Sequence, residues 1–505
     1  MAFPQRPGVF INESLTPLAQ VDQSTGRSSA VFVGTNAAGG PVSPTLVTSW
    51  TSFSKLYGGF GNGSDLLPFA VYEFFNNGGG SCYVVRAVNN NAVVAKTTLQ
   101  DAEETSKPAL LVSAKAPGTY GNAIEVTVTA GSTTSTVNFS VTNTTTNQTE
   151  VYNEVTLDPT ASRNLLSMVN GGSSLVTVAV ATGAATAAFD PSFNPALVAD
   201  VALSGGTEGT STPDLVAAAQ QIGTLSGTFD VNLPGVNSAT TINSLATWAE
   251  AAGNVFLVVD GVVGAATDTA AANAAAQKAL VTGAGALTAS STIGVYGPWL
   301  SASDPLAAVA GTPRLLPPGG FVLGQYARTD VTRGVQKVAA GLTASLRGVL
   351  GPQFTYAPAD LDSLNQSGIN AIKVVPGAGT CIFGARTLSL GMPDRYINIR
   401  RTLITLKDGL TSLTRFAIFE MNDDVLRQQI TDLCEQYLRT QWASGLLRGV
   451  SEGEAFFVVC DDSNNDDTTI AQGEVNIQIG VSLQTPAEFI VFNIGQTASG
   501  STVSA

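Results

Sequence analysis

The chain has 505 residues, and 24 Lys and Arg against 38 Asp and Glu give a formal net charge of −14. Only 12% of the residues are charged while 44% are hydrophobic, a balance typical of folded rather than disordered protein. There is no histidine, which excludes Ser–His and Cys–His nucleophilic sites and every histidine-ligated metal or haem.

The first 93 residues predict an extended arm followed by the start of an α/β layer. Residues 1–20 hold three prolines around the β-prone piece Val9-Phe10-Ile11, and proline lacks the donor that a central strand needs. The apolar run at 30–34 predicts a buried strand, because polar and Gly residues bound it. Residues 66–75 predict a helix and 82–88 a second strand, so the spacing favours an α/β layer.

The character of the chain changes near residue 94 and changes back near 206. Between these points it is rich in Thr, Ser and Asn, and apolar and polar residues alternate at 125–129 and 137–141. Such alternation is typical of half-buried antiparallel strands, so an inserted β-rich domain is predicted. Afterwards helices are predicted at 213–222, 244–252 and 268–280, and strands at 230–233, 255–260 and 293–296.

The last third of the chain predicts long amphipathic helices followed by strands. Apolar residues between 426 and 438 fall on one helix face, with Asn422 as the expected N-cap and Gly445 as the end. Strand-like runs follow at 455–460, 475–483 and 489–494. Four widely spaced cysteines are expected to be reduced, buried thiols of an intracellular protein.

The predicted fold class is therefore α/β and α+β multidomain. An α/β middle domain carries the inserted β-rich domain, and an α+β C-terminal domain follows, with extended arms at both ends of the chain. The expected limits are 1–20 for the N-terminal arm, 21–93 with 206–345 for the middle domain, 94–205 for the insert, 346–485 for the C-terminal domain and 486–505 for the C-terminal strand and tail.

Tests for chemistry nominate no catalytic or cofactor site. No Gly-Lys dipeptide exists for a phosphate loop, and the Gly-x-Ser-x-Gly match at 449–453 follows a predicted helix in a chain without histidine. The acidic run at 461–467 departs from a calcium loop at Asp467 and Gly473. Net acidity without a basic cluster argues against nucleic acid, and no apolar stretch has the roughly 18–20 residues that span a bilayer. No cofactor, metal, nucleic acid or membrane insertion is expected, and no enzyme activity.

Short motifs in both the N-terminal part and the last 210 residues resemble those of contractile phage tail sheath proteins and of related contractile injection systems. Each motif is weak by itself, but their order along the chain is specific. The motifs are RPGVFINE at 6–13, AVFVG at 30–34, YVVR at 83–86, YGPW at 296–299, PPGG at 317–320, GQYARTD at 324–330, GARTL at 384–388, FEMND at 419–423, AFFVVCD at 455–461 and PAEF at 486–489.

The resemblance implies a structural subunit that polymerises as stacked hexameric rings around an inner tube. Contraction by rigid-body rearrangement of subunits would drive the tube through a cell envelope. Terminal arms of such proteins add strands to the sheets of neighbours, so we expect two segments to exchange between copies. These are Val9, Phe10 and Ile11 at one end and Phe489, Ile490, Val491 and Phe492 at the other.

The resemblance also implies partners and a location. The partners would be copies of the chain, an inner tail tube protein, and baseplate and tail terminator proteins, within a virion assembled in the bacterial cytoplasm. Five cations are candidates for contact with an acidic tube: Arg400, Arg401, Lys407, Arg427 and Arg439. Two alternatives remain open: another self-assembling protein, surface-layer or capsid-like, and a carboxylate enzyme such as a glycoside hydrolase.

Overall fold

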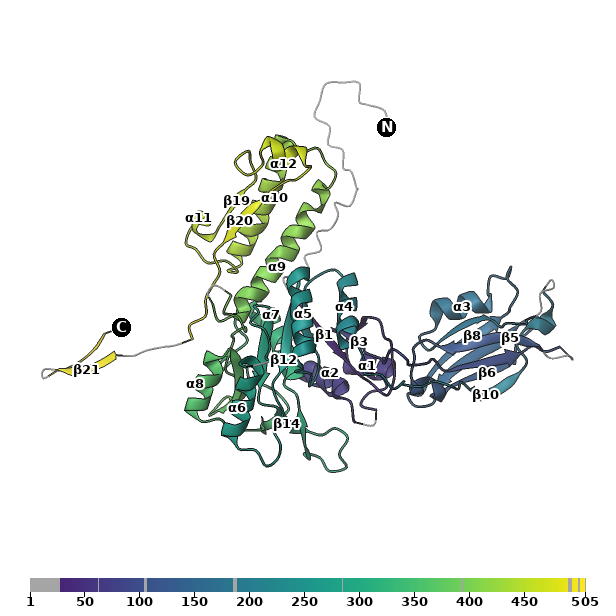
Figure 1. Ribbon diagram of the computed structural model, residues 1–505. Helices are drawn as coiled ribbons and strands as arrows, with labels where there is room; N and C mark the ends of the chain where they lie inside the picture. The colour runs from purple at the N-terminus through teal and green to yellow at the C-terminus, as the bar shows by residue number, and fades with distance from the viewer. Residues whose placement is uncertain are drawn as a thin grey trace, which may run out of the picture.

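The computed structural model describes residues 28–61, 63–103, 107–184, 189–283, 285–391, 394–488, 493–497 and 500–504. Figure 1 shows a central α/β body, a β-rich body to one side of it, and a helical body that rises from it. The mixed α/β, multidomain class that the sequence predicts is confirmed.

The central body is built on an eight-stranded sheet with the order β18-β17-β13-β12-β11-β1-β3-β2. The six inner strands are parallel, and β2 and β18 close the two edges in antiparallel pairing. Its elements are β1 (Ser29–Gly34), β2 (Thr45–Val47), α1 (Trp50–Tyr57), α2 (Leu66–Asn76), β3 (Cys82–Arg86), α4 (Leu215–Gln220), β11 (Phe229–Asn232), α5 (Ala239–Ala252), β12 (Val255–Asp260), α6 (Ala270–Val281), β13 (Ile293–Gly297), α7 (Gly319–Arg333), α8 (Pro358–Gln366), β17 (Ile369–Val375) and β18 (Gly379–Ile382).

Two apolar cores lie on opposite faces of this sheet because consecutive strand side chains point to opposite sides. On β1, Phe32 packs in the core of α2 and α7, while Val31 and Val33 pack in the core of α4, α5 and α6. Strands buried on both faces are mostly apolar, as at 255–259, and all six residues of β12 are buried. A small sheet of β14 (Leu300–Ser303), β15 (Pro313–Leu316) and β16 (Val349–Pro352) adjoins this body.

The β-rich body holds two antiparallel sheets, β10-β6-β7-β8 and β4-β5-β9. Its core lies between the sheets and α3, and the alternating burial of β6 and β7 matches the alternation of the sequence. Its elements are β4 (Lys96–Gln100), β5 (Pro108–Ala114), β6 (Ile124–Ala130), β7 (Val137–Asn143), β8 (Gln148–Val155), α3 (Leu165–Gly172), β9 (Val176–Val180) and β10 (Val198–Ala202).

The helical body consists of two long helices and a two-stranded sheet, with two small cores between them. Asp423, and not Asn422, caps α10: its side chain accepts a hydrogen bond from the backbone N–H of Leu426, as a carboxylate at that position does. The elements are α9 (Ile397–Thr414), α10 (Asp424–Ala443), α11 (Glu452–Ala455), β19 (Phe456–Val459), α12 (Asp467–Ala471) and β20 (Gln478–Val481), and β21 (Asn493–Thr497) and β22 (Gly500–Ser504) form a hairpin.

The structure carries the central sheet past residue 345, where the sequence places the end of the middle domain. Strand β17 pairs in parallel with β13, and β18 pairs with β17. The expected limit followed a change in local composition, which carries no information about pairing between strands 70 residues apart. The predicted limit at 345 therefore falls inside the central body, and the other limits stay predictions.

Candidate functional site

The strand-exchange segments cannot be placed. Val9, Phe10 and Ile11, and likewise Phe489, Ile490, Val491 and Phe492, lie outside the described residues. The described part of the chain does contain a sheet suited to receive added strands. Strands β19 and β20 pair only with each other among the described residues, so each has an outer edge of backbone N–H and C=O groups. Such edges are templates for pairing with another chain.

The five cations proposed to contact a tube are not equivalent. Lys407 and Arg439 are exposed, and Arg439 pairs with Glu452 at 2.6 Å. Arg400 is half-buried. Arg401 and Arg427 are buried, so the structure removes these two from the candidates for a surface contact. Arg401 is paired with two buried acids from distant parts of the chain, and Arg427 with the exposed carboxylates of Asp424 and Asp462.

Arg401 forms a buried ion triad that joins α9 to the central body. Its guanidinium contacts the carboxylates of Asp230, on β11, at 2.7 Å and of Asp330, on α7, at 2.5 Å. All three side chains are 3% exposed. Burial opposes the charged guanidinium, but the two carboxylates outweigh it and hold the pKa of Arg401 well above its usual value. The triad therefore fixes the helical body to the sheet.

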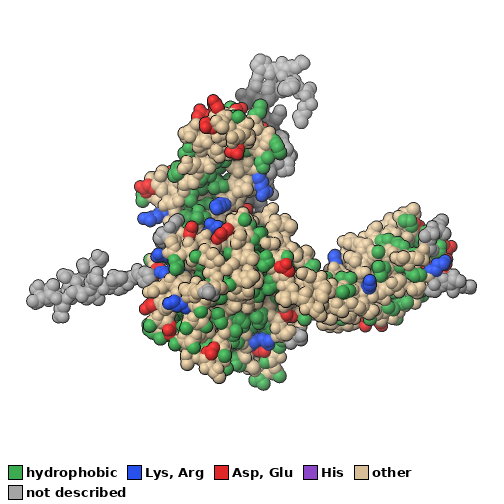
Figure 2. Space-filling view, viewed as in Figure 1, with side chains coloured by type: hydrophobic (Ala, Val, Ile, Leu, Met, Phe, Trp, Pro, Cys, Tyr) green, Lys and Arg blue, Asp and Glu red, His purple; other side chains and the backbone are tan. Residues whose placement is uncertain are grey.

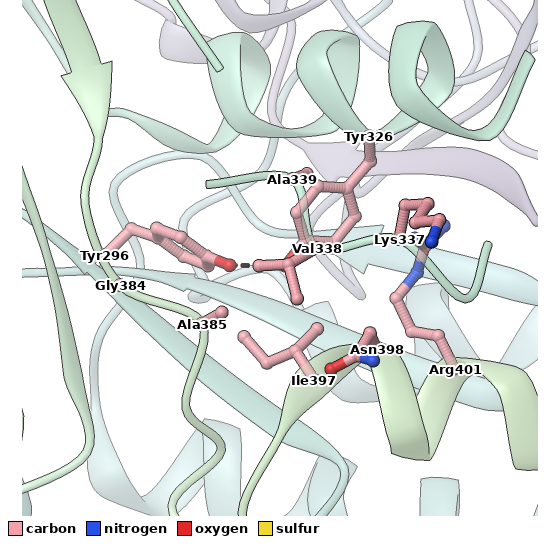
Figure 3. A pocket seen from close by; sticks show the side chains of 10 residues that line it. All are labelled: Tyr296, Tyr326, Lys337, Val338, Ala339, Gly384, Ala385, Ile397, Asn398 and Arg401. Carbon is pink, nitrogen blue, oxygen red and sulfur yellow. Dashed lines mark hydrogen bonds between the residues drawn. The ribbon is translucent and has the colours of Figure 1, made fainter. Parts of the chain in front are cut away.

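Aromatic groups complete the contact around Arg401 (Figure 3). The guanidinium lies 4.4 Å from the ring centre of Tyr326, and the hydroxyl of Tyr326 hydrogen-bonds that of Tyr296 on β13. The remaining cavity, about 10 Å³, is at the lower limit for one water molecule. This arrangement is a packed joint between two bodies, with no room for a substrate.

Ligands of open parallel sheets usually bind where the strand order reverses, at the carboxyl ends of the strands. Here that point lies between β1 and β11, since β3 lies on one side of β1 and all later parallel strands lie on the other. The start of α7 packs there, since a Cβ at Gly319 would lie 2.2 Å from the side-chain nitrogen of Asn232 at the end of β11. At the end of β12, Asp260 accepts hydrogen bonds from the backbone N–H of Gly319, the first residue of α7, at 2.6 Å and of Gly235 at 2.9 Å. Burial raises the pKa of Asp260 to about 6, so it is ionised at neutral pH and complements the positive end of the α7 dipole.

Two glycines of α7 allow α2 to pack against it at short range. A Cβ at Gly320 would lie 2.7 Å from the Cα of Ala70, and one at Gly324 would lie 2.6 Å from the carbonyl oxygen of Phe74. These distances are shorter than any normal Cβ contact, so only glycine fits. The PPGG and GQYARTD motifs of the sequence therefore serve this helix contact and the triad, since Tyr326 and Asp330 belong to the second motif.

The insert meets the central body at Arg86, the last residue of β3. Its side chain is 1% exposed and donates hydrogen bonds to the carbonyl oxygens of Asn36, at 3.3 Å, and Pro117. Its guanidinium also lies 5.4 Å from the ring centre of Tyr120. Because Pro117 and Tyr120 belong to the insert segment, one buried side chain links the two bodies.

Glu73 on α2 gives the fold an expected dependence on pH. Burial raises its pKa from 4.5 to about 7, although Asn76 donates a hydrogen bond to it at 3.3 Å. The folded state thus binds the proton of the Glu73 carboxyl group more tightly than the unfolded state does. The resulting stability is complete below about pH 4.5 and is lost as pH rises through 7. When the pH rises from about 5 to about 8, the free energy of unfolding of the wild type is expected to fall by on the order of 2 kcal/mol more than that of Glu73→Gln. Urea denaturation of both proteins at both pH values measures the two changes. Equal losses in the two proteins would contradict the assignment.

The motifs rejected on sequence grounds occupy ordinary structural positions. Ser451 precedes the short helix α11, and Asp466 caps α12 by accepting from the backbone N–H of Thr469 at 2.8 Å. Asp461 likewise accepts from the N–H of Ser463 at 2.8 Å. Within the described ranges, no group of three or more His, Cys, Asp or Glu residues is placed to hold a metal ion. Nor does any helix in those ranges have the length and apolar character to cross a membrane.

Sequence reasoning missed the buried acids Asp230, Asp260, Asp330 and Glu73. A weak signal existed for Asp230 and Asp260, which are charged residues inside or at the end of otherwise apolar strands. Such a position indicates a paired or hydrogen-bonded carboxylate. Their partners lie on α9 and α7, and no local pattern names them.

Residues 394–497 match the family of the phage tail sheath C-terminal domain. The predicted resemblance to tail sheath proteins is thereby confirmed for this part of the chain.

Two tail sheath proteins of phages are similar to part of this chain. The tail sheath protein of Vibrio phage KVP40 is 29% identical over 189 residues, which are 37% of this chain and 27% of that protein. The tail sheath protein of Enterobacteria phage T4 is 28% identical over 189 residues, with 37% and 28% covered. The match thus spans little more than a quarter of the length of these relatives.

Solved structures extend the likeness of fold to nearly the whole chain. The sheath complex of an extracellular contractile injection system in its contracted state has a TM-score of 0.58 at 20% identity, with 99% of each chain covered. A sheath tail protein from Listeria innocua has a TM-score of 0.58 at 14% identity, with 90% of this chain and 95% of that one covered. At these identities the likeness establishes a shared fold.

Proposed function

We propose that this chain is the structural subunit of a contractile tail sheath. The observation that carries the proposal is the match of residues 394–497 to the phage tail sheath C-terminal domain family, in a chain that shares its fold with a solved sheath subunit over almost its whole length. The subunits form six-membered rings stacked helically around an inner tube. Contacts between different surface patches build such open assemblies.

Neighbouring subunits are joined by exchanged terminal strands. Residues 9–11 of one copy and 489–492 of another add to the outer edges of β19 and β20, where backbone hydrogen bonds supply affinity. A sheet of two strands is marginally stable alone, and added strands complete it. The arms thereby link neighbouring subunits.

Contraction then needs rigid bodies and no catalytic residue. The triad at Arg401 and the glycine contact between α2 and α7 hold each subunit together, so that subunits rotate relative to one another as units. The extended sheath is kinetically trapped and relaxes into a better-packed lattice. Its partners are the inner tube, baseplate and tail terminator proteins, and the particle is a virion tail assembled in the host cytoplasm.

Electron microscopy of the purified chain tests the proposal. The full-length protein is expected to form hollow striated cylinders, alone or on added tube protein, and a chain lacking residues 1–20 is expected to form none. Flat sheets would favour a surface-layer protein instead, and monomers in both conditions would overturn the sheath function.

Val9→Pro is the sharper variant. Proline removes one ladder donor from the exchanged strand and is expected to abolish cylinders. Urea denaturation of the free subunit shows whether the variant still folds. Val9→Thr is the matched control, since it keeps the donor and the β-branched shape. Normal cylinders from Val9→Pro would show that residues 9–11 pair with no neighbour.

A further inference from the structure

Five large apolar side chains are exposed in the connection from α9 to α10 and the first turn of α10. We call these five residues the apolar knob. Their exposed fractions are Phe416 38%, Ile418 64%, Phe419 102%, Met421 79% and Val425 75%. Apolar groups gathered in this way mark an interaction surface.

The knob is held in a fixed shape. Phe419 has a φ of +71°, a left-handed conformation that costs free energy for an aromatic residue, and it presents the ring fully to the outside. The following residues are anchored: Asn422 donates to the carbonyl oxygen of Glu474 at 2.8 Å, and Asp423 caps α10. A rigid aromatic group loses little entropy on binding, which is the property of an interface anchor.

Acidic side chains surround the knob. Glu420 lies within it, and Asp424 and Asp462, 88% and 86% exposed, are brought together by Arg427, which contacts both carboxylates. Red side chains gather at this end of the helical body in Figure 2. A partner surface must therefore be apolar at its centre and basic around it.

The chain carries a surface of that kind on its central body. Arg333, Leu342, Arg347, Lys373 and Phe383 form what we call the basic edge. No Asp or Glu occurs in 331–359 or 363–393, although the chain has 38. Within the described residues, no carboxylate lies within 4 Å of Arg333, Arg347 or Lys373.

The residues of the basic edge lie on adjacent segments. The segment that contains Leu342 and Arg347 pairs onto β18, with the N–H of Gly341 donating to Ile382 at 2.9 Å and that of Leu346 to Thr380 at 2.8 Å. Strand β18 pairs with β17, and the ammonium of Lys373 lies 3.7 Å from the ring centre of Phe383. Leu342 and Phe383 are 65% and 45% exposed. Burial and the neighbouring Arg347 lower the pKa of Arg328, as expected where cations lack acidic partners.

The knob and the basic edge of one copy cannot meet. Asn398, at the start of α9, donates to the carbonyl oxygen of Gln336 at 3.1 Å, which places the basic edge beside that end of the helix. The knob follows the other end. The 18 residues of α9 separate them by about 27 Å at 1.5 Å per residue. Any contact between the two surfaces is therefore between copies.

We propose that the apolar knob of one copy docks on the basic edge of a second copy. This is a head-to-tail contact in which apolar centres meet and opposite charges ring them. It rests on the proposed function, because head-to-tail contacts build the rings and helices of a sheath. It is separate from strand exchange, since it uses folded surfaces only.

A charge exchange between two variants tests the contact. The knob-reversed chain carries Glu420→Lys and Asp424→Lys, and the edge-reversed chain carries Arg333→Glu and Arg347→Glu. Each is expected to self-associate at least about tenfold more weakly than the wild type in sedimentation at low salt. A mixture of the two is expected to recover association, because the lysine knob of one chain meets the glutamate edge of the other. Recovery also shows that both variants fold.

Two further variants separate charge from the apolar contact. Phe419→Asn keeps a residue that tolerates the left-handed backbone and is expected to weaken association by a similar factor. The control is Val151→Asn, which removes an exposed apolar side chain of the insert in the same way, and it is expected to associate as the wild type does.

Each result decides the inference. If the wild type forms cylinders and the charge-reversed and Phe419→Asn chains associate as strongly as it does, the docking contact is overturned and the sheath function stands. Closed oligomers or flat sheets that the variants abolish would support the contact and overturn the sheath function. A mixture that fails to recover, or reversed chains that associate normally and lose only binding to the tube protein, would overturn the contact between copies.

Discussion

Replacing Arg401 with methionine is expected to destabilise the chain by about 3–5 kcal/mol. The reason is the environment that the change leaves behind. Asp230 and Asp330 are each 3% exposed, and without the guanidinium two carboxylates face each other in a region closed to water. Urea denaturation of the wild type and the variant measures the loss, and the helical body is expected to separate from the sheet first, because α9 carries the lost group.

The control for this prediction is Lys407→Met, about 1.7 turns further along α9. Lys407 is exposed, so its removal is expected to leave stability nearly unchanged. The triple variant Arg401→Met, Asp230→Asn, Asp330→Asn removes the uncompensated charges and is expected to recover part of the loss. If the triple variant were no more stable than Arg401→Met, packing of the arginine stem and not charge would explain the effect.

Gly320→Ala and Gly324→Ala are each expected to cost about 1–3 kcal/mol. The double variant is expected to cost less than the sum, because one displacement of α2 makes room for both methyl groups. Alanine in a helix is normally better than glycine by about 1 kcal/mol, so a loss here indicates a steric clash. The added methyl group of either variant would lie within 2.7 Å of α2, and the two helices must move apart to accept it. Thermal unfolding and urea denaturation both report the change.

Gly453→Ala is the matched control, because Gly453 is also helical and has no atom within 4 Å of its missing Cβ. This variant is expected to be neutral or slightly stabilising. A stable Gly320→Ala, Gly324→Ala double variant would show that α2 moves freely on α7, which would contradict the rigid subunit that contraction requires.

Some elements of the structure were predictable from the sequence and others were not. The strand at 255–260 was predicted with the bounds that the structure gives, because a continuous apolar run has few other solutions. The helix that α10 forms was predicted from its apolar face, with an error of one residue at its cap. Arg401 and Arg427 were interpreted as surface cations, because sequence spacing on a helix does not reveal an acid that packs from another element.

The sequence by itself determined the classes of segment: apolar runs, alternating strands and amphipathic helices follow from side-chain hydrophobicity and its period along the chain. The absence of histidine and the ordered motifs likewise belong to the sequence alone. Only the tertiary structure decided which strands share the central sheet, which charges are buried against each other, and that α9 holds an apolar, acidic loop one helix length from a basic surface. The physical reason is that pairing, burial and separation depend on residues far apart in the chain, whereas sequence patterns are local.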